Sequence, residues 1–237
     1  MGVAVITGAA GGIGGAIARA FGAGGYGLAL LDRAEVSVPD ALSIALDLTD
    51  PAAVADAFGR ISARWGRIDA LINVAGINHQ APVREMQVAD WDRMMDVNVG
   101  HMFLAAKHAL PQMGRGAAIV NMASIAGHVA TPDYPAYVTT KAAVESFTFA
   151  LSQEVGDRGI RVNAVAPGWV NAGFTDAALA ASDAPEDIRA AARDAHLLGR
   201  MAEPDEVADA ALWLASDAAS FVTGQTLFVD GGLMRKH

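Results

Sequence analysis

The stretch from residue 3 to residue 14 decides the fold: Val3-Ala4-Val5-Ile6-Thr7 runs straight into Gly8-Ala9-Ala10-Gly11-Gly12-Ile13-Gly14. A β-branched strand that ends in glycines and leads into an Ala- and Ile-containing helix is typical of a turn that cradles a pyrophosphate. The glycines let the backbone approach the phosphates, which then bind free N–H groups at the start of the helix. A glycine-rich turn alone is a weak signal, because it can also simply connect a strand to a helix.

A carboxylate ends the second predicted strand, Leu28-Ala29-Leu30-Leu31-Asp32, eighteen residues after Gly14. Such a carboxylate can accept hydrogen bonds from ribose hydroxyls, and it repels a 2′-phosphate. The sequence therefore favours NAD over NADP as the cofactor. Arg33 complicates this interpretation, because an arginine beside the ribose can hold a 2′-phosphate.

Short apolar runs alternate along the chain with longer Ala-rich stretches of helical period, which predicts βαβ units around a parallel sheet buried on both faces. We expect an α/β fold in which residues 1–237 form a single doubly wound Rossmann-type domain, with a predominantly parallel seven-stranded sheet and helices on both faces. The predicted strands are residues 3–7, 27–31, 43–46, 70–74, 117–123, 160–166 and 225–230, and the predicted helices are residues 12–24, 51–65, 90–112, 136–157 and 204–216. The irregular segment at about 168–200, with its own short helix opening at Pro185, is predicted to be a substrate lid.

The composition limits the classes of function. The 237 residues are 53% hydrophobic, and 26 acidic side chains outnumber 17 basic ones to give a formal net charge of -9. An excess of acids argues against a nucleic-acid partner. The sequence contains no cysteine, no cluster with metal-ligand spacing and no leader-like or membrane-spanning apolar run. We therefore expect a cytoplasmic protein with no metal and no membrane partner.

Tyr137 and Lys141 lie four residues apart near the start of a predicted helix, so their side chains share one face. A lysine ammonium near a phenol favours the phenolate, so we expect it to lower the pKa of Tyr137 towards neutrality, where the side chain can exchange a proton with an alcohol or a carbonyl. Ser124 follows the predicted strand 117–123 and can donate a hydrogen bond to the same substrate oxygen. A tyrosine and a lysine at this spacing are also common on protein surfaces, so the pair needs support from other motifs.

Other motifs supply that support, and together they resemble the short-chain dehydrogenase/reductase family along essentially the whole chain. The matching residues are Thr7-Gly8 with Gly12 and Gly14, Asp47 in Leu46-Asp47-Leu48, Asn73-Val74-Ala75-Gly76, Asn98, Ser124, Tyr137 with Lys141, Pro167-Gly168, and the ending Gly224-Gln225-Thr226 to Asp230-Gly231-Gly232. Motifs in this order are a specific signal. The resemblance implies a nicotinamide-dependent oxidoreductase.

The resemblance also implies a role for each matching residue. Tyr137 would be the general acid/base, Ser124 would position and polarise the substrate oxygen, and Lys141 would lower the pKa of the tyrosine and bind the nicotinamide ribose. Asn98 would hold a water in a proton relay. The cofactor-binding residues would be Gly8, Gly12, Ile13, Gly14, Asp32 at the adenosine ribose, Arg33, Asp47 at the adenine, Leu48, Asn73, Ala75, Gly76, Tyr137, Lys141, Pro167, Gly168 and Val170. The family resemblance further implies a homotetramer built on the long helices and the C-terminal strand.

Two departures from the family pattern concern the cofactor side. Val74 replaces an asparagine that often stands there, so one polar contact with the central strand is expected to be missing. Only the fourteen residues 33–46 separate Asp32 from Asp47. Residues 33–42 should therefore form a short loop in place of a full helix.

A third departure concerns the nicotinamide carboxamide. After the Pro167-Gly168 motif the family often has a threonine that bonds this group, whereas this chain has Asn171-Ala172 and then Thr175. We expect the carboxamide to be recognised by Asn171, by Thr175 or by the backbone.

By motif position, the substrate should contact the segments after Gly76, Ser124 and Pro167, together with the residue three before the catalytic tyrosine. The candidates for substrate contact in these segments are His79, His128, Tyr134 and Trp169, with Asn78 and Ala126 beside them. The aromatic residues can equally serve ordinary loop packing, and the histidines can be surface or structural residues.

Arg189 and Arg193 share a helical face in the predicted lid, with His196 nearby, and could bind a substrate carboxylate. Acidic residues are interleaved with them, so a solvated face of mixed charge explains the same pattern.

The sequence therefore predicts an NAD-dependent oxidoreductase that acts on a secondary alcohol or its ketone, such as a polyol, a sugar acid or a cyclic diol. The enzymatic alternative is a 3-oxoacyl-thioester reductase on an acyl carrier, for which the acidic composition offers no visible basic entrance. A non-catalytic nucleotide-sensing protein with the same fold is the other alternative, and the intact set of Ser124, Tyr137 and Lys141 argues against it.

Overall fold

Seven parallel strands form one sheet in the computed structural model, which describes residues 1–130 and 132–236. The strand order is β3-β2-β1-β4-β5-β6-β7, so the direction in which the sheet is built reverses between β1 and β4. The strands are β1 Val3–Thr7, β2 Gly27–Asp32, β3 Leu42–Ala45, β4 Ile68–Asn73, β5 Met113–Met122, β6 Arg161–Pro167 and β7 Thr226–Val229. The predicted doubly wound fold is confirmed, with small shifts at the strand ends.

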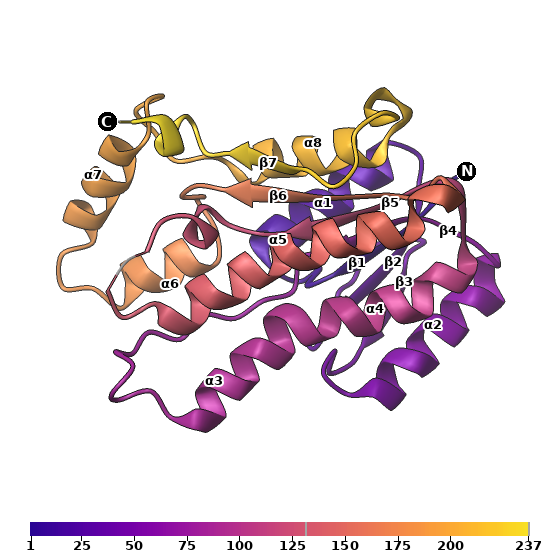
Figure 1. Cartoon of the computed structure of the whole chain (residues 1–237), viewed down its shortest axis with the longest axis horizontal. Helices are drawn as coiled ribbons and strands as arrows, with labels where there is room; N and C mark the ends of the chain where they lie inside the picture. The colour runs from indigo at the N-terminus through magenta and orange to yellow at the C-terminus, as the bar shows by residue number, and fades with distance from the viewer. Residues whose placement is uncertain (131, 237) are drawn as a thin grey trace.

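Helices cover both faces of the sheet. Helices α1 (Gly12–Ala23) and α8 (Pro204–Ala215) pack on one face, and α2 (Pro51–Trp65), α4 (His101–Ala109) and α5 (Pro135–Val155) pack on the other. In Figure 1, α4 and α5 run in front of the sheet and α1 and α8 lie behind it. Because both faces are covered, the central strands are apolar along nearly their whole length.

The helix predicted over residues 90–112 is interrupted. Helix α3 (Val88–Met95) passes into a π-helical turn at Asp96–Gly100 before α4 begins, and a short 3-10 turn at Leu110–Gln112 follows α4. A π-turn adds one residue to the helical repeat and is frequent at functional sites. Asn98 lies at the centre of this turn and is fully buried. Hydrophobic periodicity does not reveal a single added residue, which is why the prediction shows one continuous helix.

The predicted lid lies beyond the carboxyl ends of the strands, whereas the loop at 33–41 returns from the carboxyl end of β2 to the amino end of β3. No helix occurs between β2 and β3, as the sequence predicts for residues 33–42. The segment at 168–200 contains the predicted helix α7 (Pro185–Ala195) and a shorter helix, α6 (Phe174–Ala180), that the sequence analysis missed. Figure 1 shows α6 and α7 at the end to which the arrows of β6 and β7 point. Doubly wound sheets bind their ligands at this end.

Two further searches of the described residues gave negative results. No helix within residues 1–130 and 132–236 has the length and apolar character needed to cross a membrane. Within the same residues, no three His, Cys, Asp or Glu side chains gather closely enough to hold a metal ion.

Candidate active site

A cavity of about 870 Å³ opens at the carboxyl ends of the strands. Its walls come from the glycine-rich turn after β1, the ends of β2 to β6, the first turns of α5 and the 168–200 segment. The predicted residues that line it are Gly8, Gly12, Ile13, Gly14, Asp32, Arg33, Asp47, Leu48, Ala75, Gly76, Ser124, Tyr134, Tyr137, Lys141, Pro167, Gly168, Trp169 and Val170. Most of the cofactor and catalytic candidates thus share one cavity.

The glycine-rich turn is packed too closely for side chains. A Cβ on Gly8 would lie 2.6 Å from the backbone nitrogen of Ala75, and a Cβ on Gly14 would lie 2.0 Å from the carbonyl oxygen of Gly8. Helix α1 begins after Gly11, which provides no side-chain cap for the first N–H groups. Uncapped N–H groups at a helix start bind phosphate well. The residues present therefore fit the pyrophosphate of a nicotinamide dinucleotide.

Two carboxylates line the cavity at the ends of β2 and β3. The oxygens of Asp32 accept hydrogen bonds from the N–H groups of Ala10 and Ala34, each at 3.0 Å. Asp47 accepts hydrogen bonds from the N–H and the hydroxyl of Thr49 at 2.9 and 2.7 Å. The backbone hydrogen bond from Thr49 is the main cause that lowers the pKa of Asp47. These contacts fix both carboxylates beside the glycine-rich turn.

The catalytic candidates meet at the start of α5. Tyr137 is the third residue of this helix, and Ser124 lies near enough for its hydroxyl to influence the pKa of the tyrosine. Ser124 itself begins the 3-10 turn at Ile125–Gly127, and its Oγ accepts a hydrogen bond from the N–H of Ala126 at 3.1 Å. Lys141 lies one turn along α5, with Nζ 5.6 Å from the centre of the Tyr137 ring. The structure brings Ser124, Tyr137 and Lys141 together as the sequence predicts.

The predicted lowering of the Tyr137 pKa is wrong for this geometry. Burial raises the pKa of Tyr137 to about 12, and the Ser124 hydroxyl opposes that shift only in part. Burial also lowers the pKa of Lys141 to about 8. The Lys141 ammonium donates its hydrogen bond to the carbonyl oxygen of Met122, at 2.8 Å. Desolvation of the two buried side chains causes both shifts, and the sequence spacing of Tyr137 and Lys141 does not reveal it.

Two predicted asparagines serve the framework and do not line the cavity. Asn98 accepts a hydrogen bond from the N–H of Ile77 at 2.7 Å, and its Nδ2 donates to the carbonyl oxygen of Ile77 at 2.9 Å and to the hydroxyl of Thr140 at 3.0 Å. The π-turn therefore ties the segment after β4 to α5. Asn73 is fully buried and donates to Asn121 on β5 at 2.8 Å, which places it inside the sheet.

His101 is a buried residue that the sequence analysis missed. Its Nδ1 lies 2.5 Å from the carbonyl oxygen of Val97 in the π-turn, and its Nε2 lies 3.3 Å from the hydroxyl of Thr7 at the end of β1. The Thr7 oxygen accepts hydrogen bonds from the N–H groups of Val74 and Ala75, so its own proton points to His101. Burial lowers the pKa of His101 to about 4. A lone histidine in an apolar helix gives no sequence signal for this arrangement.

Comparison with known proteins identifies the family of the chain. Residues 8–234 match a family model described as enoyl-(acyl carrier protein) reductase. A cis-4-hydroxycyclohexanecarboxylate dehydrogenase from Sinomonas cyclohexanicum is 41% identical over 97% of this chain and 95% of its own. The chain belongs to the short-chain dehydrogenase/reductase family.

Further members of this family extend the comparison. A D-threitol dehydrogenase from Mycolicibacterium smegmatis is 39% identical over 97% of this chain and 92% of its own. The solved structure of a Thermoplasma acidophilum aldohexose dehydrogenase, in ligand-free form, superposes with a TM-score of 0.95 at 32% identity and covers 100% of this chain and 95% of its own. As a short-chain dehydrogenase/reductase, the protein is an oxidoreductase of the type that acts on CH–OH groups with a nicotinamide cofactor.

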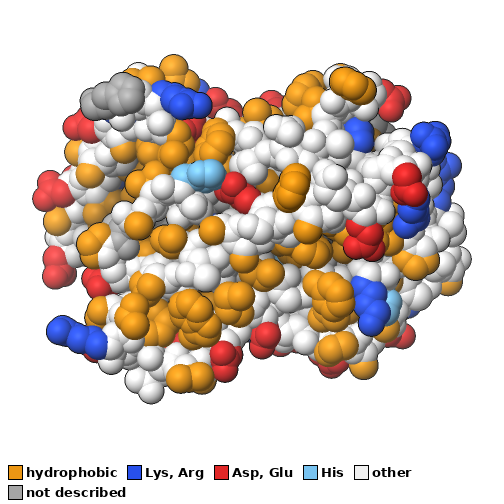
Figure 2. All heavy atoms as spheres, viewed as in Figure 1, with side chains coloured by type: hydrophobic (Ala, Val, Ile, Leu, Met, Phe, Trp, Pro, Cys, Tyr) orange, Lys and Arg blue, Asp and Glu red, His pale blue; other side chains and the backbone are white. Residues whose placement is uncertain are grey.

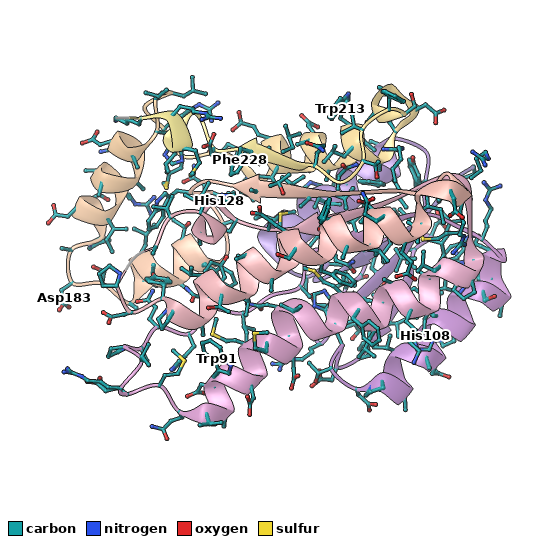
Figure 3. The ribbon with its side chains drawn as sticks, viewed as in Figure 1. Trp91, His108, His128, Asp183, Trp213 and Phe228 are labelled. Carbon is teal, nitrogen blue, oxygen red and sulfur yellow. The ribbon has the colours of Figure 1, made fainter. Side chains whose placement is uncertain are left out.

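The substrate candidates divide into two groups. Tyr134 and Trp169 line the cavity, whereas His79 and His128 do not. His79 lies 3.6 Å from the carboxylate of Asp90 at the surface. The Nε2 of His128 lies 2.8 Å from Glu145 on α5, and its ring packs edge-on against Phe228 of β7 at 4.9 Å between ring centres. Figure 3 shows His128 and Phe228 together on the outer side of the molecule.

Of the candidate residues in the predicted lid, only some line the cavity. Thr175 lines the cavity, whereas the side chain of Asn171 is bonded to Glu203 on the surface. Arg189 pairs with Glu186 at 3.5 Å, as expected for a solvated face of mixed charge. His196 is buried and packs against the backbone of the Pro167-Gly168 motif. Of the two side chains expected to recognise the carboxamide, Thr175 is the one that reaches the cavity.

Proposed function

We propose that this enzyme transfers a hydride between NAD(H) and a secondary alcohol or its ketone, such as a polyol or a cyclic diol. The observation that carries the proposal is the shared cavity: the glycine-rich turn and Asp32 lie at one end of it, and Ser124, Tyr137 and Lys141 lie at the other. The names of the relatives support a secondary alcohol as the substrate, since one is a dehydrogenase of cis-4-hydroxycyclohexanecarboxylate and the other a dehydrogenase of D-threitol.

The proposed chemistry divides between the chain and its cofactor. Tyr137 exchanges the proton of the substrate oxygen, and Ser124 positions that oxygen with its hydroxyl. Lys141 binds the nicotinamide ribose. Asn98 links the π-turn to Ile77 and Thr140, and it would bind the water of the proton relay. When bound, the nicotinamide supplies or accepts the hydride.

The protonation state of Tyr137 affects the rates of reduction and oxidation differently. Because burial raises the pKa of Tyr137 to about 12, the side chain is a phenol at pH 7 and is ready to donate its proton to a ketone oxygen. Oxidation of the alcohol needs the phenolate. At pH values below that pKa, the phenolate fraction increases tenfold for each unit by which the pH is raised. Oxidation is therefore expected to speed up as the pH rises.

The preference for NAD rests on the fixed carboxylate of Asp32, which repels a 2′-phosphate. The test compares the dissociation constants of NADH and NADPH for the wild-type protein and for Asp32→Asn. The substitution removes the charge and keeps only one of the two oxygens that accept the N–H groups of Ala10 and Ala34. Loss of the charge should improve NADPH binding about 10-fold relative to NADH. Tighter binding of NADPH than of NADH by the wild-type protein would refute the preference.

The proposed reaction itself is tested by a panel of secondary alcohols and ketones with both cofactors, read by nicotinamide absorbance. Turnover with neutral polyols or cyclic diols supports the proposal. A 3-oxoacyl-thioester reductase is the second candidate, and the family-model description as an acyl-carrier-protein reductase favours it. Faster reduction of acetoacetyl thioesters than of every simple ketone in the panel would select that candidate.

The proposed lid is the segment at about 168–200, within a single domain formed by residues 1–237. Its residues Trp169, Phe174, Thr175, Ala178 and Ala195 line the cavity opposite the catalytic side chains. A long segment of this kind in a compact domain usually covers a binding site. Protection of its amides from hydrogen exchange on addition of NADH and substrate would support this role, and unchanged exchange would contradict it.

We also propose a homotetramer in a reducing compartment such as the cytoplasm. Phe103 on α4 and Phe149 on α5 leave 54% and 60% of their surface exposed. Figure 2 shows hydrophobic side chains on the face formed by these helices. Exposed aromatic side chains of this size are common at subunit interfaces. Light scattering should give the mass of four chains, and the mass of a single chain would contradict the proposal.

A further inference from the structure

The charged side chains of the cavity are concentrated at one end. Asp32, Arg33 and Asp47 follow β2 and β3 and line the cavity there. Ser124 follows β5, which is three strands away from β2 in the sheet order. At the usual strand spacing this separates the two ends by roughly 14 Å. Charges at the β2–β3 end are therefore too distant to contact a small molecule whose oxygen binds Ser124.

The only charged side chain lining the catalytic end, among the residues that the structure describes, is that of Lys141. Lys141 has just 2% of its surface exposed and donates to the carbonyl oxygen of Met122. The ammonium lies 5.6 Å from the centre of the Tyr137 ring, within the catalytic group of residues. It cannot pair with an anionic group elsewhere on the substrate.

The cationic residues of the lid do not place a positive charge at the catalytic end of the cavity. Helix α7 contributes Ala195 to the cavity wall, whereas neither Arg189 nor Arg193 lines it. His196 is buried, with Nδ1 on the carbonyl oxygen of Ala192 at 2.6 Å and Nε2 accepting the N–H of Trp169 at 3.2 Å. Both ring nitrogens of His196 are thus occupied within the protein.

The polar side chains that line this part of the cavity are uncharged, apart from Lys141. Tyr134 and Gln80 line the cavity and are hydrogen-bonded to each other. Asn78 lines it as well, and its side-chain oxygen has no hydrogen-bond partner among the described residues. Hydroxyl and amide groups of this kind suit the hydroxyl groups of a neutral ligand. A carboxylate placed among them would lose its hydration without gaining a counter-charge, which is unfavourable.

We infer that the substrate is neutral, a diol or polyol with no carboxylate, and that the cavity selects against hydroxy acids of the same shape. This inference deepens the proposed function and rests on it. It excludes sugar acids, which the sequence analysis allowed. It also implies that this chain differs in substrate charge from any relative that acts on a ring carboxylate.

The test uses pairs of compounds that differ only in charge: cis-4-hydroxycyclohexanecarboxamide with the carboxylate, and 3-hydroxybutyramide with 3-hydroxybutyrate. For each pair, kcat/KM is measured with NAD⁺, and the Kd for the enzyme–NADH complex is measured by calorimetry. Each amide should exceed its carboxylate by about 100-fold in kcat/KM, because an unpaired charge would be desolvated. A carboxylate that binds as tightly as its amide overturns the inference.

A variant pair tests the cause. Ala195→Arg adds a cation to the lid wall of the cavity, and Ala195→Gln adds similar bulk without charge. The arginine variant should raise kcat/KM for the carboxylates about 10-fold over the glutamine variant, whereas the two variants should give similar kcat/KM values for the amides. Equal effects of the two variants on the carboxylates would overturn the inference.

The failure of the inference and the failure of the proposed function remain distinguishable. If carboxylates are oxidised as well as amides, the dehydrogenase function stands and the neutral pocket does not. If the calorimetric preference for amides holds but no compound is oxidised with either cofactor, the pocket inference stands at the level of binding and the proposed function fails. Absence of binding for both members of each pair overturns the inference as well.

Discussion

The catalytic framework and the base of the lid each contain one buried histidine, but they are connected differently. In both residues Nδ1 bonds to the carbonyl oxygen four residues earlier, at 2.5 Å for His101 and 2.6 Å for His196. From His101 the contacts continue through the Thr7 hydroxyl into the backbone at the end of β4. From His196 they end at the single N–H of Trp169.

This difference indicates that the two regions have different roles in catalysis and binding. The framework ties β1, β4, the π-turn and α5 together with buried hydrogen bonds, so the reacting groups keep a fixed geometry. The lid region exposes Phe174, Leu197 and Leu198, and the hydrogen bonds of its buried histidine reach only one backbone N–H outside its own helix. Changes in the framework should therefore affect kcat and stability, and changes in the lid should mainly affect KM.

The largest expected effect comes from removing the proton-transferring group of the framework. Tyr137→Phe should lower kcat by about 10³-fold, because general acid–base catalysis contributes on this scale. The binding of NADH, measured by fluorescence titration, should change little. Initial rates with the best alcohol of the panel give the measurement.

Tyr134 provides a matched control, since both rings line the same cavity and their centres lie 6.5 Å apart. Tyr134→Phe removes one hydrogen bond to Gln80 and should change kcat by less than about 10-fold. If Tyr134→Phe lost as much activity as Tyr137→Phe, the assignment of the acid/base group would be wrong.

The next largest effect concerns stability and pH. The pKa of His101 falls from 6.5 to about 4 on folding, so the unfolded chain binds more protons between those values. The corresponding stability is fully present above pH 6.5 and is lost as the pH falls towards 4. Between pH 7 and pH 5 this costs about 2 kcal/mol. His101→Gln should lower stability at pH 7 and flatten this part of the pH dependence, as measured by urea unfolding.

An exposed histidine offers the control for this experiment. His79→Gln should leave the pH dependence of the unfolding free energy close to that of the wild-type protein, because half of the side chain is in solvent. An unchanged pH dependence in His101→Gln would show that the buried histidine is not the source of the acid sensitivity.

The fold could be predicted almost entirely from the sequence, because local patterns determine it. The strand at 3–7 and the glycine-rich turn each carry their signal within a few residues, and the start of α2 is equally local, because Asp50 caps it and Pro51 is its first residue. The π-turn at Asp96–Gly100 carries no such signal. One added residue leaves the surrounding hydrophobic period almost unchanged, and the contact that accompanies it, with Thr140, lies 42 residues away.

The site was predictable where motifs determine it and unpredictable where burial does. Ser124, Tyr137 and Lys141 meet as predicted, yet the pKa of Tyr137 shifts in the direction opposite to the prediction, because desolvation depends on tertiary packing. His79 and His128 follow the right motifs and still point away from the cavity, each towards a surface carboxylate. Motif position places a segment at the site but does not set the direction of a side chain.

The smallest expected effect tests the anchor of the lid. His196→Leu removes the hydrogen bonds of both ring nitrogens, one with the carbonyl oxygen of Ala192 and one with the N–H of Trp169. The bond to Trp169 is the one that anchors the segment beside the cavity, and its loss corresponds to about 1 kcal/mol. We expect KM for the alcohol to rise about 5-fold while kcat changes by less than about 2-fold. His196→Gln serves as the control, because an amide oxygen near the position of Nε2 can accept the same N–H and should keep KM near the wild-type value. A large fall in kcat with unchanged KM in His196→Leu would instead place His196 in the catalytic framework and remove the difference between the two regions.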